Sequence, residues 1–287
     1  MVKNIRQQFH AQLKEIFPST EIDTFFNLLI EHFAGLSRLD LAMNPKLQLE
    51  KVQQQNLEKA LERLKNQEPI QYIIGETEFY GLKFKVDKNV LIPRPETEEL
   101  VDWIIKDTPT TSDLSVLDIG TGSGCIAVSL AANMAEAKVT AWDVSSGALQ
   151  IARQNATLNK VNVDFQEQDI LKTHNPANIK YDIIVSNPPY VRDLEKEWMQ
   201  PNVLEFEPEL ALFVKNEDAL LFYRKILEFA QNHLSPKGQI YFEINEYLKP
   251  ELETLLEKYD FEAVEFRQDI FDKTRMLRIT AQTDAYC

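Results

Sequence analysis

Four consecutive residues, Asn187-Pro188-Pro189-Tyr190, combine groups that suit the binding of a planar amino group. The asparagine offers a carbonyl acceptor, and the prolines lack N–H groups and fix φ, which holds nearby backbone carbonyls outward. The aromatic ring supplies a flat face. Together they could accept both hydrogens of an NH2 group while the ring stacks on its plane. The structural alternative is an ordinary Pro-Pro turn after the apolar run Tyr181–Val185.

A second segment that could bind a ligand is Val116–Ala127, which reads as a strand, a glycine-rich turn and the start of a helix. Its glycines would let the backbone approach a ligand closely. The dinucleotide fingerprint G-x-G-x-x-G needs a glycine where Cys125 stands, so the spacing favours an adenosine cofactor that lacks a pyrophosphate. The predicted cofactor loop consists of Gly120, Thr121, Gly122, Ser123 and Gly124.

Polar residues also follow the next predicted strands. Asp143 could accept hydrogen bonds from both ribose hydroxyls, as acids do in nucleotide-binding sheets. Asp169 could receive an adenine amino group, with Ile170 packed on the ring, and Asn187 follows the fourth strand. Each alone fits an ordinary loop. Together with the cofactor loop, these residues follow successive strands along one edge of the sheet. They therefore predict a binding site at the carboxyl ends of the strands.

The elements that would position these residues alternate between strand and helix from residue 115 onward. This alternation predicts an α/β fold with a doubly wound, mainly parallel sheet. The predicted strands are Ser115–Ile119, Val139–Trp142, Val161–Gln166, Tyr181–Val185, Gln239–Ile244 and Met276–Thr280.

Three regions are predicted along the chain. Residues 1–67 are predicted to form a helical bundle, because apolar residues recur at helical spacing, and Ser19 with its neighbours offers N-cap chemistry for the second helix. Residues 68–92 are predicted to form a β-hairpin-like connector that includes Pro69–Gly75. Residues 93–287 are predicted to form the α/β domain, in which a helix starts after Pro93 and Pro95. The apolar positions of the bundle are Ile5, Phe9, Leu13 and Phe17, then Phe25, Leu28, Leu29 and Phe33, then Leu57, Leu61 and Leu64.

Composition narrows the possible functions. The 287 residues are 44% hydrophobic, enough for a sizeable core, and contain no run of the ~18 apolar residues that a membrane span needs. We expect a cytoplasmic protein without a disulfide framework, since Cys125 and Cys287 lie far apart. The net charge of −14 argues against a phosphate-backbone binder. We expect no metal site, because the histidines show no ligand spacing: His10, His32, His174 and His233.

From about Glu68 onward the chain resembles the release factor glutamine methyltransferase family (HemK/PrmC) of class I S-adenosylmethionine-dependent methyltransferases. The Asn-Pro-Pro-Tyr motif alone is shared with nucleic-acid methyltransferases. The upstream Pro-Arg-Pro-Glu-Thr-Glu segment is much more specific to this family. The matching segments are Pro69–Gly75, Phe79–Gly81, Ile92–Glu98, Asp118–Gly124, Ser186–Tyr190, and Phe206-Glu207-Pro208 with Ala211-Leu212.

The resemblance implies a seven-stranded class I methyltransferase domain over residues 93–287, with an N-terminal helical bundle over residues 1–67 that recognises the substrate. It also implies methyl transfer from S-adenosylmethionine, which leaves S-adenosylhomocysteine, to the N5 amide nitrogen of the glutamine in the Gly-Gly-Gln motif of peptide chain release factors. The Asn187 side-chain carbonyl and the Pro188 backbone carbonyl would each accept one amide hydrogen, and Tyr190 would stack on the amide. Pro189 and Leu91 would lie near the substrate. We expect a monomer whose substrate is a protein.

Alternatives stay open. A nucleic-acid methyltransferase acting on adenine N6 or guanine N2 would use the same motif on a flipped base. A non-catalytic binding module and a nicotinamide oxidoreductase fit less well. Arg94 and Glu96 are interpreted as a helix-start ion pair, and Glu207 as a residue that orders the loop after the motif. Two residues depart from the family pattern: Asn245 and Asp272.

Overall fold

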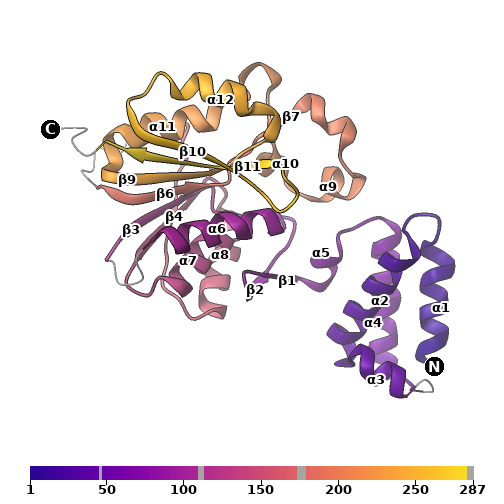
Figure 1. Cartoon of the computed structure of the whole chain (residues 1–287). Helices are drawn as coiled ribbons and strands as arrows, with labels where there is room; N and C mark the ends of the chain where they lie inside the picture. Colours follow the sequence, from indigo (N-terminus) through magenta and orange to yellow (C-terminus); the bar gives the residue numbers. More distant parts are fainter. Residues whose placement is uncertain (45–46, 109–112, 173–178, 283–287) are drawn as a thin grey trace. The chain divides into compact units, whose positions relative to one another are not determined.

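The computed structural model describes residues 1–44, 47–108, 113–172 and 179–282. Within them the chain forms two compact units (Figure 1). The helical unit comprises Met1–Gly75 together with Gln200–Phe206, and the larger unit comprises Glu76–Met199 and the chain from Glu207 onward. The units separate after Gly75, which lies within the predicted connector of residues 68–92. The assignment of a role to each region stays a prediction.

The helical unit has an apolar core in which Phe9 and Phe26 pack edge to face at 5.4 Å. The predicted positions other than Phe17 lie on its helices; Phe17 lies between α1 and α2, and Leu28 is exposed. The expected N-cap is wrong in detail, because Pro18 occupies the cap of α2 and no side chain bonds there. The helices are α1 Val2–Leu13, α2 Ser19–Ala34, α3 Arg38–Met43, α4 Lys51–Lys65, α5 Ile70–Ile74 and α9 Pro201–Phe206.

The predicted strand character of Pro69–Gly75 is wrong, because residues 70–74 form helix α5. Pro69 occupies the N-cap of α5, where its missing N–H removes no helical hydrogen bond, and Gly75 ends the helix with φ +82°. The isoleucines Ile70 and Ile73, three residues apart, face the core of the helical unit. The hairpin is shorter than predicted and lies just downstream, as β1 Glu76–Phe79 paired antiparallel with β2 Leu82–Lys85.

The larger unit is built on a seven-stranded sheet in the order β10-β11-β9-β6-β3-β4-β5 (Figure 1). Strands β9, β6, β3, β4 and β5 are parallel, and β11 is antiparallel to its neighbours β9 and β10. The predicted fold class is confirmed. The strands are β3 Ser115–Ile119, β4 Lys138–Asp143, β5 Asp164–Glu167, β6 Tyr181–Ser186, β9 Leu234–Glu243, β10 Phe261–Gln268 and β11 Thr274–Ala281.

The strand order contains a switch point between β3 and β6. From β3 the chain moves through β4 to β5 on one side, then returns to β6 on the other side of β3. Ligands bind to such sheets outside the carboxyl ends of the strands at this point. The cofactor loop follows β3 and Asn187 follows β6, so the topology alone brings the two candidate segments together.

Helices cover both faces of the sheet, with α11 and α12 on one side and α6, α7 and α8 on the other (Figure 1). Short elements complete the unit: β7 Val191–Arg192 paired with β8 Phe213–Val214, α10 Glu209–Leu212, and the 3-10 helices η1 Asp193–Trp198, η2 Asn216–Asp218 and η3 Glu246–Leu248. The main helices are α6 Pro95–Asp107, α7 Cys125–Asn133, α8 Ser146–Leu158, α11 Leu221–His233 and α12 Lys249–Leu256.

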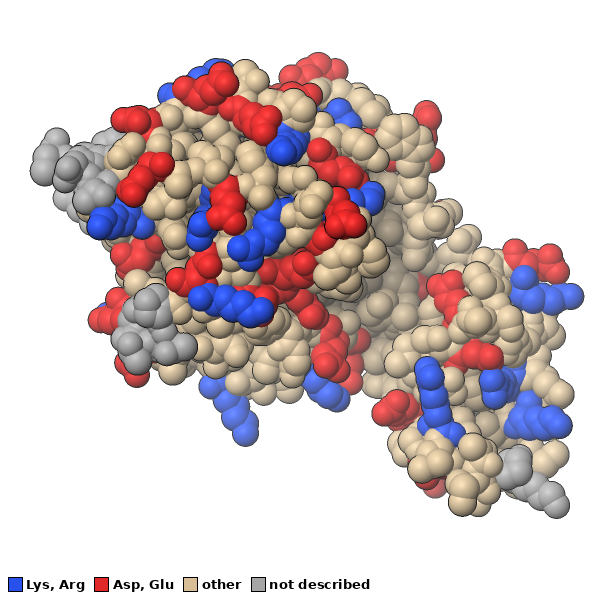
Figure 2. Space-filling view, viewed as in Figure 1, with Lys and Arg blue, Asp and Glu red and all other residues tan. Residues whose placement is uncertain are grey.

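Acidic and basic side chains are interspersed over the visible face of each unit (Figure 2). Among the residues that the structure describes, no helix is long and apolar enough to cross a membrane, and no group of three or more His, Cys, Asp or Glu is placed to hold a metal ion. His174 and Cys287, which the sequence interpretation included, lie outside the described residues.

Candidate active site

A cavity of about 240 Å³ lies in the larger unit, where the loops after β3, β4, β5 and β6 meet the segment before α6. The lining is mostly apolar, with polar groups from the four loops. The predicted site residues that line it are Leu91, Gly120, Thr121, Gly122, Ser123, Asp143, Asp169, Ile170, Asn187, Pro188 and Pro189.

The cofactor loop leaves open space where a ligand would approach. Gly120 and Gly122 both have positive φ, and a Cβ added to either would meet no atom within 4 Å. Gly124 has a different role, because its Cβ would come within 3.1 Å of Ala152 on α8. It is the one loop residue that does not line the cavity. The first two glycines border the cavity, and the third permits close helix packing.

Asp143 ends β4, and its carboxylate is held by the backbone on both sides. Gly122 N–H donates to Oδ2 at 2.8 Å, and Ser145 N–H donates to Oδ1 at 2.8 Å. Burial raises the pKa of this carboxyl, and the backbone donors oppose that rise. A carboxylate fixed in this way keeps lone pairs for further donors.

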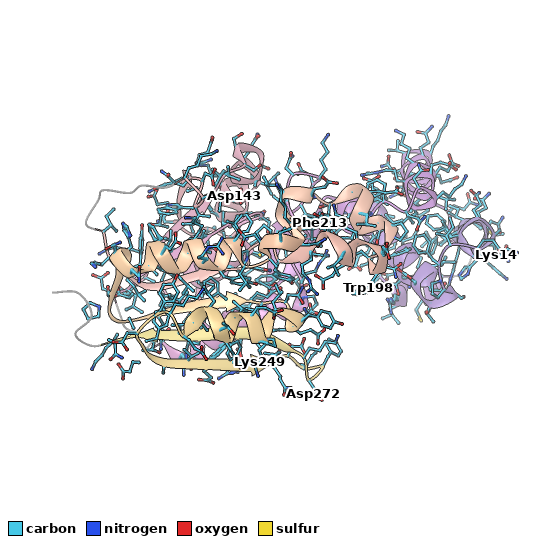
Figure 3. All side chains as sticks on the ribbon, turned by 90° about the horizontal axis from the view of Figure 1, so that it is seen from above. Lys14, Asp143, Trp198, Phe213, Lys249 and Asp272 are labelled. Atoms are coloured by element: carbon cyan, nitrogen blue, oxygen red, sulfur yellow. The ribbon has the colours of Figure 1, made fainter. Side chains whose placement is uncertain are left out.

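Asp169 and Ile170 lie just beyond β5 and line the same cavity. The Asp169 carboxylate accepts from Leu171 N–H at 3.0 Å and pairs with Lys172 at 2.9 Å. Ile170 packs against the core cluster on the α11 side of the sheet. Figure 3 shows the position of Asp143 among the side chains of the larger unit.

The motif after β6 is held by side chains that come from distant parts of the chain. Asn187 Nδ2 donates to Thr97 Oγ1 at 3.3 Å, and Thr97 Oγ1 donates to Glu243 Oε2 at 2.6 Å. The Tyr190 hydroxyl donates to Glu243 Oε1 at 2.8 Å. Tyr190 is therefore bonded to the buried carboxylate, and it is not among the cavity-lining residues.

Burial dominates the electrostatics of this network. It raises the pKa of the Glu243 carboxyl, while the Thr97 and Tyr190 hydroxyl donors oppose the rise. Burial and the Glu243 charge also raise the pKa of the Tyr190 phenol well above its ordinary value. The phenol thus stays protonated and donates to the acid.

The segment before α6 is tied to the chain after the motif by an ion pair. Arg94 Nη2 lies 2.6 Å from Glu207 Oε1, and the other carboxylate oxygen accepts from Ile92 N–H at 3.1 Å. The Glu207 side chain is only 1% exposed. The sequence interpretation paired Arg94 with Glu96 at the helix start, and the structure pairs Arg94 with Glu207 instead. Glu207, which the sequence interpretation expected to order the loop after the motif, holds Ile92 and Arg94 of the segment before α6.

Three residues that support the site have no counterpart among the predicted site residues. Thr97 and Glu243 form the network beneath Asn187. Asn155, fully buried on α8, donates to the Ser123 and Lys85 carbonyls and accepts from Lys85 N–H, which joins the cofactor loop to β2. Thr97 lies in the Pro-Arg-Pro-Glu-Thr-Glu segment, which the sequence interpretation had identified, but no role was predicted for Thr97 itself.

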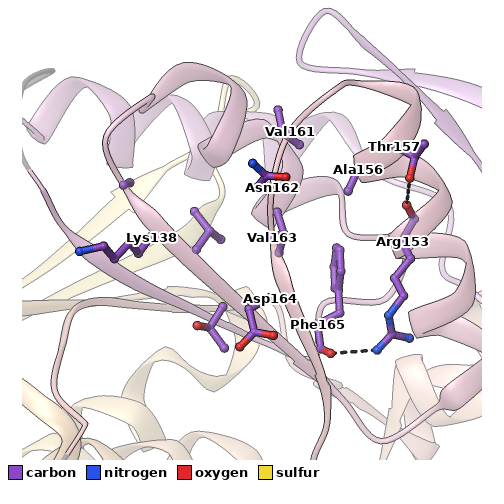
Figure 4. Close-up of a pocket in the computed structure, with 12 residues that line it drawn as sticks. Lys138, Arg153, Ala156, Thr157, Val161, Asn162, Val163, Asp164 and Phe165 are labelled. Carbon is purple, nitrogen blue, oxygen red and sulfur yellow. Dashed lines mark hydrogen bonds between the residues drawn. The ribbon is translucent and has the colours of Figure 1, made fainter.

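A second, more open hollow of about 820 Å³ lies where β4 and β5 begin (Figure 4). Arg153 extends along it and donates to the Phe165 carbonyl at 2.8 Å. Lys138 lies on its other side. It shares no lining residue with the cavity at the carboxyl ends of the strands.

Comparison with protein families matches two segments of the chain. Residues 4–75 match the PrmC N-terminal domain, and residues 98–204 match the methyltransferase small domain. The chain is 53% identical to the release factor glutamine methyltransferase of Flavobacterium psychrophilum, over 97% of this chain and 99% of that protein. It is 45% identical to the protein of the same name from Bacteroides thetaiotaomicron, over 96% and 99%.

Solved structures share the fold at low sequence identity. The T. thermophilus 16S rRNA N2 G1207 methyltransferase in complex with AdoMet and guanosine has a TM-score of 0.52 and 17% identity, over 72% of this chain and 50% of that one. A methyltransferase from Pyrococcus furiosus has a TM-score of 0.51 and 21% identity, over 70% and 90%. At these identities the likeness shows the class I methyltransferase fold.

Proposed function

The chain belongs to the release factor glutamine methyltransferase family, and on this premise we propose that it methylates the N5 amide nitrogen of the glutamine in the Gly-Gly-Gln motif of peptide chain release factors. It is a methyltransferase. The near full-length similarity to relatives of that name carries the proposal. The position of Asn187 beside the cofactor loop supports the proposal, because the methyl donor and the methyl-accepting amide must lie next to each other in the same cavity.

The residues of the cavity fit S-adenosylmethionine. Gly120 and Gly122 leave room for the ligand beside the loop backbone, and Asp143 presents an oriented carboxylate that suits a ribose diol. Asp169 and Ile170 line the region that an adenine ring would fill. S-adenosylmethionine supplies an electrophilic methyl group on a sulfonium.

The acceptor poses the chemical difficulty, since the lone pair of an amide nitrogen is delocalised into its carbonyl. The Asn187 side-chain carbonyl and the Pro188 backbone carbonyl accept the two amide hydrogens. These two bonds orient the nitrogen toward the methyl group and stabilise the positive charge that develops on it. Pro189 and Leu91 line the same cavity and would exclude water from the reacting nitrogen. The proton that nitrogen loses passes to solvent.

The role of Tyr190 in this scheme differs from a simple stacking platform. Its hydroxyl is fixed by Glu243, so the ring has a defined orientation next to the motif. We propose that this ring borders the acceptor amide. We also propose that the enzyme acts as a monomer in the cytoplasm, where release factors work, and takes no nucleic acid as substrate.

A transfer assay tests the proposal. The protein is incubated with methyl-labelled S-adenosylmethionine and either a release factor or its variant with alanine in place of the Gly-Gly-Gln glutamine. We expect label on the first and none on the second, with mass spectrometry locating it on the glutamine side chain. Label on RNA or DNA offered in parallel, or on neither protein, would overturn the proposal.

A further inference from the structure

The proposed function requires Asn187 to present its oxygen to the acceptor, and the inference that follows rests on that function. An asparagine side chain can rotate by 180° and exchange the places of its oxygen and its NH2 group. The rotated form would set one NH2 group against the NH2 of the substrate and repel it. Something in the protein must therefore select one of the two orientations.

Thr97, the residue next to the Asn187 side chain, can only accept a hydrogen bond from it. Thr97 carries a single hydroxyl hydrogen, and Glu243 Oε2 lies 2.6 Å away, where the ionised carboxylate accepts that hydrogen. Toward Asn187 the Thr97 oxygen can then act only as an acceptor. The group that faces it at 3.3 Å must be the NH2 of Asn187, which leaves the Asn187 oxygen for the cavity.

The direction of this chain of bonds is set by Glu243. Its second oxygen accepts the Tyr190 hydroxyl at 2.8 Å, so both oxygens receive donors, as a carboxylate requires. Its backbone carbonyl accepts the Tyr223 hydroxyl at 3.0 Å, which fixes the end of β9. Thr97 and Glu243 are each 2% exposed, so water does not compete for these bonds.

We propose that Thr97 and Glu243 are positioning residues that hold Asn187 with its oxygen toward the acceptor amide. Glu243 orients the Thr97 hydroxyl, and that hydroxyl selects the orientation of Asn187. Through Tyr190 the same carboxylate fixes the other end of the motif. One buried acid on β9 thus sets both ends of a loop that follows β6.

Thr97→Val tests the proposal, because it keeps the shape of the side chain and removes the acceptor. We expect kcat to fall by roughly tenfold or more, while the Kd of S-adenosylmethionine stays near the wild-type value. Thr97→Ser keeps the hydroxyl and restores most of the lost rate. The control is Thr108→Val at the other end of α6, which removes a buried hydroxyl that donates to the Ile104 carbonyl at 2.7 Å. Its kcat stays at the wild-type value.

A double-mutant cycle separates positioning from a general loss of stability. In the Asn187→Ala background, Thr97→Val should lower the residual rate no further, since the residue it orients is gone. A full additional loss would overturn the proposal, as would a Thr97→Ser variant as slow as Thr97→Val. Circular dichroism melts of all variants show whether they are folded.

If no release factor is methylated, the proposed function fails, but the orientation of Asn187 can still be tested by NMR spectroscopy. The ¹⁵N–¹H signals of the Asn187 side-chain NH2, assigned by their loss in Asn187→Ala, report the bond to Thr97. We expect these signals to shift in Thr97→Val and to stay in place in Thr108→Val. Unchanged signals in Thr97→Val would overturn the orienting role.

Discussion

The two halves of the site are held in different ways. In the cofactor half, the Asp143 carboxylate is oriented by backbone N–H groups of Gly122 and Ser145, which lie 21 and 2 residues away in the sequence. In the acceptor half, side chains orient other side chains across 53 to 146 residues. The first half depends on the path of the backbone. The second depends on individual side chains, each of which a single substitution removes.

The largest expected effect is in the acceptor half. Asn187→Ala removes one of the two acceptors that would hold the amide nitrogen, and we expect kcat to fall by about 100- to 1,000-fold. The Kd of S-adenosylmethionine should stay nearly unchanged, because the cofactor half does not depend on this side chain. Single-turnover transfer and calorimetric titration measure the two quantities. Equal losses in both would mean that Asn187 is a structural turn residue and would break the distinction between the halves.

Asp118, a buried residue of β3 in the cofactor half, is a carboxyl group whose charged form is disfavoured by burial. Burial raises the pKa of the Asp118 carboxyl to about 7, although the Thr121 hydroxyl donates to it at 2.6 Å. Because the folded state binds this proton more tightly than the unfolded state, its contribution to stability falls as pH rises from about 4 to about 7.

Asp118→Asn removes this titration. We expect the variant to gain stability relative to wild type across that pH range, by on the order of 4 kcal/mol above pH 7. Urea unfolding of both proteins at pH 5 and pH 8 measures the difference. Parallel pH profiles would show that the Asp118 carboxyl is charged in the folded protein at both pH values.

Asp143→Ala tests the cofactor half directly. It removes the carboxylate that would bind the ribose hydroxyls, and hydrogen bonds to a charged group contribute about 1.5–3 kcal/mol. We therefore expect the Kd of S-adenosylmethionine to rise by about 10- to 100-fold. At saturating cofactor, kcat should fall much less than in Asn187→Ala. A variant that binds S-adenosylmethionine normally and transfers slowly would reverse the assignment of the two halves.

The same contrast explains what the sequence could predict. The cofactor loop and Asp143 are local features of strand, turn and helix, so their residues were identified from spacing alone, and the strand order then placed them beside Asn187. Thr97 and Glu243 were not identified, because their partners lie 90 and 146 residues away and depend on how the helices pack.

Two elements were misjudged for related reasons. The segment Pro69–Gly75 is rich in β-branched and aromatic residues, yet packing of Ile70 and Ile73 into the helical unit selects a helix. Strand β10 was missed because it lies at the sheet edge and shows no buried, alternating apolar face. In both cases tertiary context decides the structure.

Asn245 departs from the family pattern and lies within the acceptor half. Its Nδ2 donates to the Tyr190 carbonyl at 3.3 Å and to Glu195, and its Oδ1 accepts from Tyr247 N–H at 3.0 Å. We expect Asn245→Ala to lower the free energy of unfolding by about 1–2 kcal/mol. Because Tyr190 loses an anchor, kcat should fall modestly while the Kd of S-adenosylmethionine is kept. A weaker Kd with normal kcat would contradict this assignment.

Asp272, the second departure, lies in the turn between β10 and β11, well apart from Asp143 in Figure 3. Its φ of +61° is a conformation that glycine adopts without strain. We expect Asp272→Gly to raise the free energy of unfolding by about 0.5 kcal/mol, since relief of Cβ strain exceeds the added entropy of the unfolded chain. Asp272→Ala, which keeps a Cβ there, should bring no gain.

Because Asp272 belongs to neither half of the site, kcat and the Kd of S-adenosylmethionine should both match wild type in the glycine variant. Thermal melts and the transfer assay check the two statements separately. A change in kcat alone would show that this turn influences the acceptor half of the site. The route would be Asp269, which starts the turn and accepts from Lys273 N–H at 3.0 Å, and its neighbour Arg275, which lies 3.6 Å from Glu246 next to Asn245.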